Sequence, residues 1–530
     1  MHRRVSVVPL FAAFALAACS TDVAVAPVKT VKAPSLSLSV GQKSKHIVTL
    51  NGSGIPVGFA ARVTSLGGTV TSSHAGAGFA VVSGLSDDAA AQLAQSGFGD
   101  VQPDFAVSLD IPPAAIRADA SDIDAPSTNS QDAPATAARF NRQWNMRAIS
   151  APAAWTANKL GSPTVTVAIL DTGIDYDLPD LNGLVDLSRS KSFMDTFVGQ
   201  SDDPSTPDVD ESDPVILADD DILKIPAPFF AGRHPITDLN GHGTNVATMV
   251  SSKAVRYAGV TSKTTLIGVK VLGANGSGSF SDILNGVLWA ADKGADVANM
   301  SLGGGFSKSG NGQAIGTINR VFNYARQKGM VIVVSAGNSG IDLKHNGNGY
   351  SSYCDAPHVI CVASVGPLAG TTTAGNPLGT SDPNVPAFYT NFGKNNVDVA
   401  APGGNADIAN ADAKGNLPVT NWPWGPGIAS WVWSYCAKHS LIIQRNATDP
   451  KKGDIFLTTC FTTNVNLLLN NGYIGTSQAA PHVAGLAALL IAENGRGNPQ
   501  QIKRLIQKSG TPIDGSFGRS IINVKNALGL

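Results

Sequence analysis

From residue 165 onward, short apolar runs alternate with longer segments that carry the periodicity of helices. We expect strands at 165–170, 265–272, 297–302, 331–335 and 359–362, and helices at 280–293, 314–329 and 477–494. Strands that are apolar on both faces and separated by helices are typical of a parallel sheet that helices cover on both sides. The pattern therefore predicts an α/β fold with a doubly wound, mostly parallel sheet, in which ligands bind beyond the carboxyl ends of the strands.

A smaller module with a different pattern precedes this domain, at residues 45–109. The pattern predicts, in order, strand 46–50, helix 57–66, strands 69–73 and 79–85, helix 86–96 and strand 100–109. Ser86 is placed to cap the second helix and Gly97 to end it. The order βαββαβ fits a ferredoxin-like α+β fold.

Between the module and the larger domain, residues 110–142 are rich in Ala, Asp, Ser and Pro and show no periodicity. Such a composition is typical of an exposed linker. Within the larger domain, 143–530, two segments have the character of insertions, at 186–236 and 404–470. The first carries a dense run of aspartates, and the second holds four of the seven tryptophans, namely Trp422, Trp424, Trp431 and Trp433.

The first residues have the form of an export signal rather than of a folded element. A basic start, His2-Arg3-Arg4, precedes an apolar core at 5–15 that is too short to span a bilayer. The sequence Leu16-Ala17-Ala18-Cys19 resembles a bacterial lipobox, in which Cys19 is lipidated and becomes the first residue, and cleavage of an ordinary signal peptide after Ala26 is the alternative. Both interpretations predict export to the cell envelope (periplasm or outer membrane) or the extracellular space of a bacterium. In the lipobox interpretation, residues 1–18 are the signal peptide and residues 19–44 are a spacer before the small module.

Length and charge limit the classes of function. The chain has 530 residues, which predicts two or three domains, and 15% of them are charged. Its formal net charge is −1 and it has no Lys- or Arg-rich run, so nothing indicates nucleic acid or an anionic membrane surface as a partner. After the leader no apolar stretch reaches 18 residues, which argues against a membrane-spanning helix.

The run 475–485 (GTSQAAPHVAG) places Ser477 at the beginning of the long apolar helix. Its hydroxyl is expected beside free backbone N–H groups and the positive end of the helix dipole, which suit a nucleophile whose substrate develops negative charge. A base, and an acid that orients it, are offered by His242 in NGHGT and Asp171 in DTGID. The order Asp, His, Ser is the subtilisin order, and the chain resembles a subtilisin-like serine protease, or subtilase.

The resemblance implies an exported serine endopeptidase that hydrolyses peptide bonds through an acyl-enzyme, with Asp171, His242 and Ser477 as the catalytic triad. It also implies a role for Asn338, in the motif SAGNS. In the family this asparagine donates its side-chain amide to the oxyanion, beside the backbone N–H of the serine.

Each of these motifs has a structural alternative. Asp171-Thr172-Gly173 is also compatible with a simple strand-end turn, or with an aspartic protease. Such proteases require a second motif of this kind or a homodimer, and no other Asp-Thr/Ser-Gly occurs in the sequence. A lone His242 is compatible with a structural role, and Asn338 with a turn cap. For the whole chain, the alternatives are a catalytically silent, peptide-binding subtilisin-like scaffold and an enzyme that acts mainly as an esterase or peptide ligase.

The resemblance also implies two edges that bind the substrate as an added strand. One is the segment Ser301, Leu302, Gly303 and Gly304, which forms a wall of the pocket for the residue before the cut, and the opposing edge contains Leu272, Gly273 and Gly276. Main-chain pairing of this kind gives affinity with little sequence discrimination. We therefore expect protein or peptide substrates and broad specificity, with large apolar residues favoured before the cut.

The resemblance covers about residues 143–530 and, more loosely, 45–109. It implies that the small module is an inhibitory prodomain (inhibitor I9-like), an intramolecular inhibitor that the enzyme removes by a cut in the linker 110–142. A generic small α+β domain is the alternative. If Cys19 is lipidated, the lipid anchors the precursor to a membrane and the cut releases the protease.

Three positions depart from the family pattern near the predicted site. Gln478 replaces the methionine usual after the nucleophile, a residue that is sensitive to oxidation. In the helix that begins near His242, Asn245 and Thr248 replace the usual His and Gly, which leaves the base intact. His482, on another side of the long helix, is expected to be structural.

Four cysteines lie downstream of the leader, an even number that predicts disulfide bonds in an oxidising compartment. Four cysteines permit three pairings, of which the local ones, Cys354–Cys361 and Cys436–Cys460, are expected. A zinc site formed by Cys354, His358 and Cys361 is the alternative.

No cofactor is required for the predicted chemistry, and the sequence leaves the metal content open. The aspartate run of the first insertion is compatible with a structural calcium site, since hard cations take carboxylate clusters, or with a solvated surface loop. The tryptophans of the second insertion are compatible with a local core or with an additional substrate-binding surface.

Overall fold

The computed structural model describes residues 45–52, 54–110, 118–120, 130–194, 232–273, 276–351, 353–367, 382–405, 431–437, 470–513, 517 and 520–530. The predicted signal peptide, Cys19 and the spacer lie outside these ranges, as do parts of the linker and the centres of both insertions. Among the described helices, none has the length and hydropathy that a membrane span requires.

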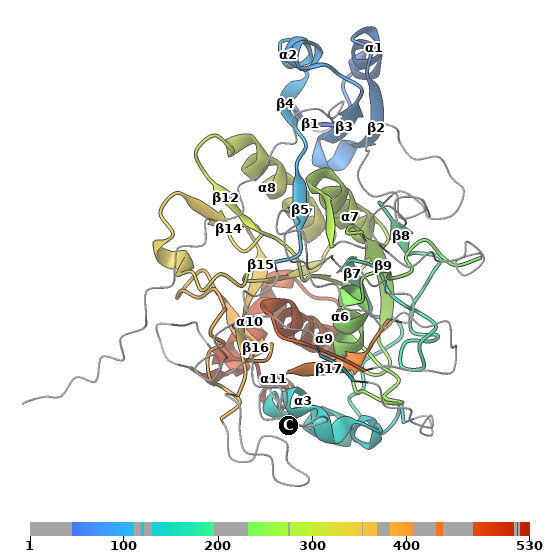
Figure 1. The fold of residues 1–530 in the computed structure, drawn as a ribbon, viewed down its shortest axis with the longest axis vertical. Coiled ribbons are helices and arrows are strands. Elements are labelled where there is room, and N and C mark those ends of the chain that lie inside the picture. The colour runs from blue at the N-terminus through green and yellow to red at the C-terminus, as the bar shows by residue number, and fades with distance from the viewer. Residues whose placement is uncertain are drawn as a thin grey trace, which may run out of the picture. The chain divides into compact units, whose positions relative to one another are not determined.

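In the described part of the chain, a nine-stranded sheet forms the centre of the large domain, with the strand order β19-β20-β16-β15-β13-β11-β7-β9-β8 (Figure 1). Every pairing in it is parallel except that of β19 with β20. The prediction of a mostly parallel sheet is confirmed. The strands are β7 (Thr166–Asp171), β8 (Lys191–Ser192), β9 (Thr265–Lys270), β11 (Val297–Met300), β13 (Val331–Ser335), β15 (Val359–Val365), β16 (Val399–Pro402), β19 (Thr511–Pro512) and β20 (Ser520–Ile521).

Helices cover both faces of this sheet (Figure 1). Strand β13 shows the alternation, because Val333 packs in the core with α9 whereas Val334 packs in the core with α7 and α8. The doubly wound α/β architecture is therefore present. The helices on the first face are α3 (Trp144–Ala148), α4 (Ala151–Thr156), α6 (His242–Val250), α9 (Thr476–Asn494), α10 (Pro499–Ser509) and α11 (Val524–Ala527), and those on the second are α7 (Phe280–Asp292) and α8 (Gly312–Gln327).

Short strands outside the central sheet connect distant segments of the chain. The pairings are β12 (Gly305–Ser307) with β14 (Gly349–Ser351), and β17 (Val432–Tyr435) with β18 (Asn470–Tyr473), which also pairs with β6 (Ala118–Ala120). Strand β17 lies within the second insertion, and β18 begins at the last residue of that insertion. There Trp431 and Trp433 are buried in a cluster with Tyr435, so these two tryptophans form a local core, while Trp422 and Trp424 lie outside the described residues.

The small module forms a four-stranded antiparallel sheet with the order β2-β3-β1-β4. Its elements follow the predicted βαββαβ order: β1 (His46–Leu50), α1 (Phe59–Ser65), β2 (Thr69–His74), β3 (Phe79–Ser83), α2 (Asp87–Ala94) and β4 (Gly99–Pro103). Ser86 caps α2 as expected, because its hydroxyl accepts a hydrogen bond from the Ala89 N–H.

The predicted strand at 100–109 is wrong as a single element, because the chain changes partner within it. After β4 it leaves the module, and β5 (Ala106–Ser108) pairs antiparallel with β10 (Ser277–Ser279) of the large domain. Asp104 stands at the change of direction, where one carboxylate oxygen accepts from the Ser281 N–H at 3.0 Å and the other from the Ser281 hydroxyl. These contacts satisfy groups at the N-terminus of α7, which explains the bend.

The two faces of the module's sheet have different partners. Val48 packs with α1 and α2 in the module's own core, whereas Ile47 packs in the core that contains α7 and α8. Polar contacts follow the same interface, since the Arg320 guanidinium donates to the Leu50 oxygen at 2.6 Å. Figure 1 shows the module beside these two helices.

Candidate active site

The predicted acid and base are in direct contact. Asp171 ends strand β7 and is fully buried, and His242 is the first residue of α6. One oxygen of the Asp171 carboxylate lies 2.8 Å from Nδ1 of His242 and also accepts from the Thr172 N–H at 2.8 Å. A carboxylate at Nδ1 holds that nitrogen as the donor and leaves Nε2 as the acceptor, which is the tautomer a general base needs.

A glycine allows the histidine helix to approach the aspartate turn. A Cβ atom at Gly243 would lie 2.2 Å from the Gly173 oxygen and 3.2 Å from the Asp171 Cβ. Any side chain there would push α6 away from β7. The glycine after His242 is therefore required by the distance between acid and base.

Sequence reasoning missed Asp238, which fixes the loop that carries the base. One of its carboxylate oxygens accepts from the Thr172 hydroxyl and from the N–H groups of Asn240 and Gly241, and the other accepts from the N–H and hydroxyl of Thr244. A buried carboxylate with five donors stabilises the loop strongly. It joins the residue after Asp171 to both sides of His242.

Ser477 lies in the first turn of α9, paired with the predicted substrate edge. Pro481, four residues later, has no N–H, so the Ser477 carbonyl lacks its usual intrahelical donor. The Ser301 hydroxyl donates to that carbonyl at 2.7 Å, and the Ser477 hydroxyl donates to the Ser301 carbonyl at 3.1 Å. The predicted nucleophile is thus held against the start of the segment 301–304, and its hydroxyl is directed to Ser301 rather than to His242.

Asn338 is oriented by the residue that precedes the serine. Its side-chain oxygen accepts from the N–H of Thr476 at 2.8 Å and from the Thr476 hydroxyl at 2.9 Å. The amide nitrogen is consequently free to donate on the other side, and it donates to the main-chain oxygen of Asp110. The Asn338 N–H also donates to the Asp110 carboxylate at 2.6 Å. The predicted oxyanion donor therefore holds a peptide carbonyl from the end of the small module.

The segment that ends at Asp110 lies along the second predicted edge. Strand β5 pairs with β10, and the Leu109 N–H donates to the Gly276 oxygen at 2.8 Å. The edge is closed by its own turn, since the Gly273 N–H donates to the Ser277 oxygen at 2.8 Å. Of the other predicted edge residues, Leu272 and Leu302 are buried in the core with α7, and Gly303 and Gly304 follow Leu302 between β11 and β12.

Two of the departures from the family pattern contact each other. The side-chain amide of Asn245 donates to the Ser434 hydroxyl at 2.8 Å, and its oxygen accepts from the Gln478 amide at 3.4 Å. The third departure, Thr248, donates to the Thr244 oxygen within α6 at 2.9 Å. The buried polar side chains of Asn245 and Gln478 are thus hydrogen-bonded to each other, and Asn245 is also hydrogen-bonded to strand β17.

His482 has the surroundings of a structural residue. Its Nδ1 lies 2.8 Å from the Gln478 oxygen and its Nε2 lies 2.8 Å from the Asn145 amide nitrogen. Complete burial lowers the pKa of the imidazole to about 4, with the hydrogen bond to Gln478 acting in the opposite direction. A neutral, fully partnered histidine of this kind braces α9 against α3.

The segment that follows the second insertion supplies a further residue beside the base. The Tyr473 ring, at the end of β18, meets the His242 ring edge-on with centroids 5.8 Å apart. The chain then continues directly into Ser477. No sequence signal indicated this contact, because it depends on how the insertion returns to the core.

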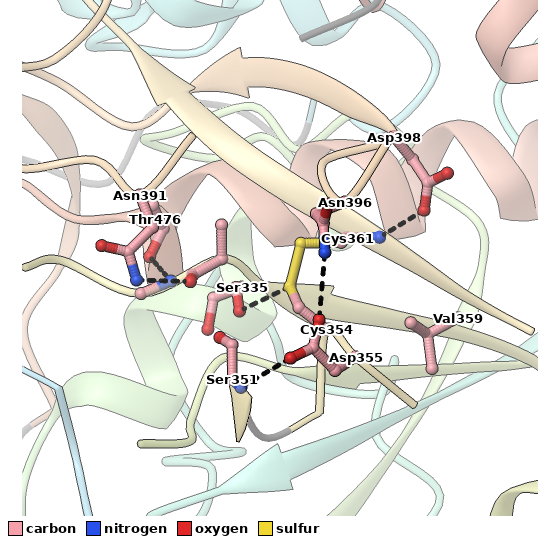
Figure 2. The surroundings of a disulfide bond; sticks show 12 residues. Ser335, Ser351, Cys354, Asp355, Val359, Cys361, Asn391, Asn396, Asp398 and Thr476 are labelled. Carbon is pink, nitrogen blue, oxygen red and sulfur yellow. Dashed lines mark hydrogen bonds between the residues drawn. A yellow bond between two sulfur atoms is a disulfide. The ribbon is translucent and has the colours of Figure 1, made fainter. Parts of the chain in front are cut away.

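A disulfide bond joins Cys354 and Cys361, with their Cα atoms 5.1 Å apart. Figure 2 shows it beside the end of strand β13, where Cys354 Sγ lies 3.5 Å from the Ser335 oxygen. Cys361 stands in β15, and its N–H donates to the Asp398 carboxylate at 3.0 Å. The bond thus braces the strand that leads to Asn338, and with it formed neither sulfur is a thiolate that could take part in the alternative zinc site.

Cys436 is also disulfide-bonded, and its predicted partner, Cys460, lies outside the described residues. Within the described ranges no group of three or more His, Cys, Asp or Glu side chains is arranged to hold a metal ion. The aspartate run at 202–221 lies outside those ranges, so the calcium prediction stays a prediction.

The sequence profile of the subtilase family matches residues 162–520. Thermitase of Thermoactinomyces vulgaris is 28% identical over 379 residues, which cover 71% of this chain and 91% of that protein. A thermophilic serine proteinase of Bacillus sp. (strain AK1) is 28% identical over 71% of this chain and 64% of its own length. Among solved structures, an epidermin leader peptide processing serine protease from Staphylococcus aureus covers 92% of this chain and 98% of its own, at a TM-score of 0.62 and 19% identity.

Proposed function

The chain belongs to the subtilase family of serine endopeptidases, and we propose that it hydrolyses peptide bonds with Asp171, His242 and Ser477 through an acyl-enzyme. The observation that carries this assignment is the Asp171 carboxylate oxygen 2.8 Å from His242 Nδ1. In addition, the side-chain oxygen of Asn338 accepts a hydrogen bond from Thr476, the residue before Ser477. Each component stands at the end of a strand or the beginning of a helix, at the edge of the sheet where ligands bind.

The first step requires the serine hydroxyl to change its partner. In the structure it donates to the Ser301 carbonyl, and for attack it turns to His242 Nε2. His242 takes the proton as Ser477 Oγ attacks the substrate carbonyl, and it later gives that proton to the leaving amine. Asp171 holds the ring in one tautomer and stabilises the imidazolium that forms.

The negative charge that develops on the substrate oxygen is stabilised by two donors. One is the Asn338 amide nitrogen, which is fixed because Thr476 occupies the amide oxygen. The other is the Ser477 N–H at the beginning of α9. Donors that are already oriented need no rearrangement in the transition state, and this is the source of their effect.

Substrates are proposed to bind as extended peptides between β10 and the segment 301–304. Strand β5 pairs with β10 in the structure, which supports binding of substrates by main-chain hydrogen bonds. Because such pairing discriminates little between sequences, we expect broad specificity with large apolar residues favoured before the cut.

The small module is proposed to be an intramolecular inhibitor. Its sheet packs against the core of α7 and α8, and its last strand fills the substrate edge as far as Asn338. Export follows from the leader, with lipidation of Cys19 anchoring the precursor to a membrane and removal of the module releasing the enzyme.

The assignment is tested by Ser477→Ala, assayed for turnover of a peptide amide and for removal of the module. Both should be lost, because both use the same nucleophile. Ser309→Ala, at an exposed serine, is the matched control and should behave as the unaltered chain. A Ser477→Ala protein that keeps peptide turnover in a protease-deficient host contradicts the assignment. Unchanged circular dichroism of this variant distinguishes loss of chemistry from loss of fold.

A further inference from the structure

One carbonyl of the chain already contacts the proposed donor to the oxyanion. The main-chain oxygen of Asp110 accepts a hydrogen bond from the Asn338 side-chain amide. That nitrogen is the proposed donor to the oxyanion. The side-chain oxygen of Asn338 accepts a hydrogen bond from the N–H of Thr476, which precedes the proposed nucleophile Ser477. In the proposed mechanism, the residue whose carbonyl contacts this donor is the one immediately before the cut.

The residues before Asp110 hold this register over a long contact. Ser108, Val107 and Ala106 pair in antiparallel register with Ser277, Gly278 and Ser279. The next residue continues the pairing, through the hydrogen bond from the Leu109 N–H to the Gly276 oxygen at 2.8 Å. A slip by one residue would turn every side chain to the opposite face.

Two further contacts anchor the far end of the segment. The Phe105 ring stacks on Phe280, the first residue of α7, with centroids 4.4 Å apart. Asp104 accepts from the N–H and the hydroxyl of Ser281. Because both anchors precede the strand, they set which carbonyl reaches Asn338.

The side chain of Asp110 has a site of its own. Its carboxylate accepts from the Asn338 N–H at 2.6 Å. A Cβ atom at residue 337 would lie 3.1 Å from the same carboxylate and 2.5 Å from the Asn391 amide nitrogen, so glycine at this position leaves room for the carboxyl group. Burial raises the pKa of the Asp110 carboxyl to about 6, which agrees with its enclosure in this pocket.

We propose that the chain's own first substrate is the peptide bond on the carboxyl side of Asp110, so that the mature enzyme begins at Ile111. This inference rests on the proposed function and specifies where the same site acts. Ser477 Oγ forms an ester with the Asp110 carbonyl carbon as the bond to the nitrogen of residue 111 breaks, and His242 passes the serine proton to that nitrogen. Water then hydrolyses the ester, which releases the Asp110 carboxylate and restores the Ser477 hydroxyl.

An aspartate before the cut differs from the large apolar residue expected for substrates in general. The difference is tolerated because the bond belongs to the same molecule. Attachment through the module raises the effective concentration of the bond, and the hydrogen bond from the Asn338 N–H holds the carboxylate in place of the contacts that an apolar side chain would make. The partly buried side chains of Phe105, Val107 and Leu109 contribute apolar contacts with the core of α7.

The test is a time course of the full chain in a protease-deficient host, with the earliest fragments analysed before later trimming. Intact mass should give an N-terminal fragment that ends at Asp110, and N-terminal sequencing should give a large fragment that begins at Ile111. Asp110→Asn keeps a side-chain acceptor for the Asn338 N–H and should be cut at the same bond within about threefold of the normal rate. Asp110→Ile loses that acceptor and should be cut there at least tenfold more slowly.

Asp100→Ile makes the same change at an exposed aspartate of β4 and should leave the rate and the bond unchanged. A first cut at another bond that still requires Ser477 overturns this inference and leaves the proposed function intact. A first cut after Asp110 that persists in Ser477→Ala overturns the proposed function, and this inference with it.

Discussion

The side-chain amide of Gln478 donates to the side-chain oxygen of Asn245 at 3.4 Å, which links the residue after Ser477 to the helix that begins at His242. Asn245 in turn donates to Ser434 of β17. Both residues depart from the subtilase pattern, and they contact each other in the structure. Where the family has a methionine after the nucleophile, this chain has a glutamine that makes a polar contact with Asn245.

Oxidation should therefore affect this enzyme slowly. A thioether beside the nucleophile is converted by peroxide to a polar sulfoxide, and Gln478 offers no sulfur there. We expect Gln478→Met to be inactivated several times faster than the unaltered enzyme at one peroxide concentration. Gln478→Leu, which is apolar without sulfur, is the control and should keep the original half-life. Equal half-lives for the methionine and leucine variants would show that this position does not control oxidation.

Asp171→Asn should retain the fold and lose activity. The amide cannot hold His242 with Nδ1 as donor in the same way, so the base is held in the wrong tautomer. We expect kcat to fall by about 10⁴ near pH 7 with a small change in KM, a magnitude known for the equivalent change in another serine protease. Steady-state kinetics on a peptide amide check this, and a loss below about tenfold would remove Asp171 from the catalytic set.

Asn338→Ala should lower kcat and leave substrate binding largely unchanged. The amide contacts the carbonyl oxygen, whose charge grows only in the transition state. The expected loss in kcat is about 10²–10³, a magnitude established on a subtilisin itself. Because Asn338 also holds Thr476, the circular dichroism of the variant should be compared with that of the unaltered enzyme. A raised KM with intact kcat would assign Asn338 to ground-state binding.

The cut module should bind the enzyme more tightly in acid than at neutral pH. Burial raises the pKa of Asp110 from 3.8 to about 6, and burial raises the pKa of Asp104 as well. Because the bound carboxyls hold protons more tightly than the released ones, this contribution is fully present below about pH 4 and is lost as pH rises through about 6.

Gel filtration of the processed mixture at pH 4.5 and 7.5 measures the effect. The apparent Kd of the module should be at least about tenfold lower in acid, since one pKa unit corresponds to a factor of ten. Asp110→Asn should reduce this dependence, with Asp104 accounting for the remainder. Tighter binding at pH 7.5 than at pH 4.5 would contradict the assignment of both carboxyls.

Removing the disulfide with Cys354→Ala and Cys361→Ala should lower stability. A loop of this length constrains the unfolded chain by about 2.5 kcal/mol in the chain-entropy estimate. Urea unfolding of the double variant in a Ser477→Ala background, which prevents self-digestion, should show the loss. An unchanged unfolding midpoint would show that the bond leaves this region's stability unaffected.

The positions of the proposed triad residues in the fold could be predicted because each follows a local pattern. Asp171 ends an apolar strand, and His242 and Ser477 begin helices that follow glycine-containing motifs. In a doubly wound sheet such ends meet at one edge, so the fold class and the motifs together place them. The place of Asn338 at the same edge could be predicted in the same way, because it follows strand β13.

Other parts of the site depend on contacts that no local pattern encodes. The five donors to Asp238 come from two separate stretches, Thr172 and residues 240–244, that meet only in the fold. The break in the strand predicted at 100–109 arises because Asp104 accepts from an N–H group at the beginning of α7. Pro103, which cannot donate a hydrogen bond within a sheet, is the sequence signal for this break. Without that break, the position of Asp110 at Asn338 could not be predicted.

The most direct test of the account is labelling of the processed enzyme with a fluorophosphonate, followed by peptide mass spectrometry. The reagent is attacked by a serine only where a base and an oxyanion site are assembled around it. We expect a single adduct on Ser477 that forms in parallel with the loss of peptidase activity, in the unaltered enzyme and in Ser309→Ala but not in Ser477→Ala. Loss of activity with the adduct on another residue, or full labelling of Ser477 with activity intact, would contradict it.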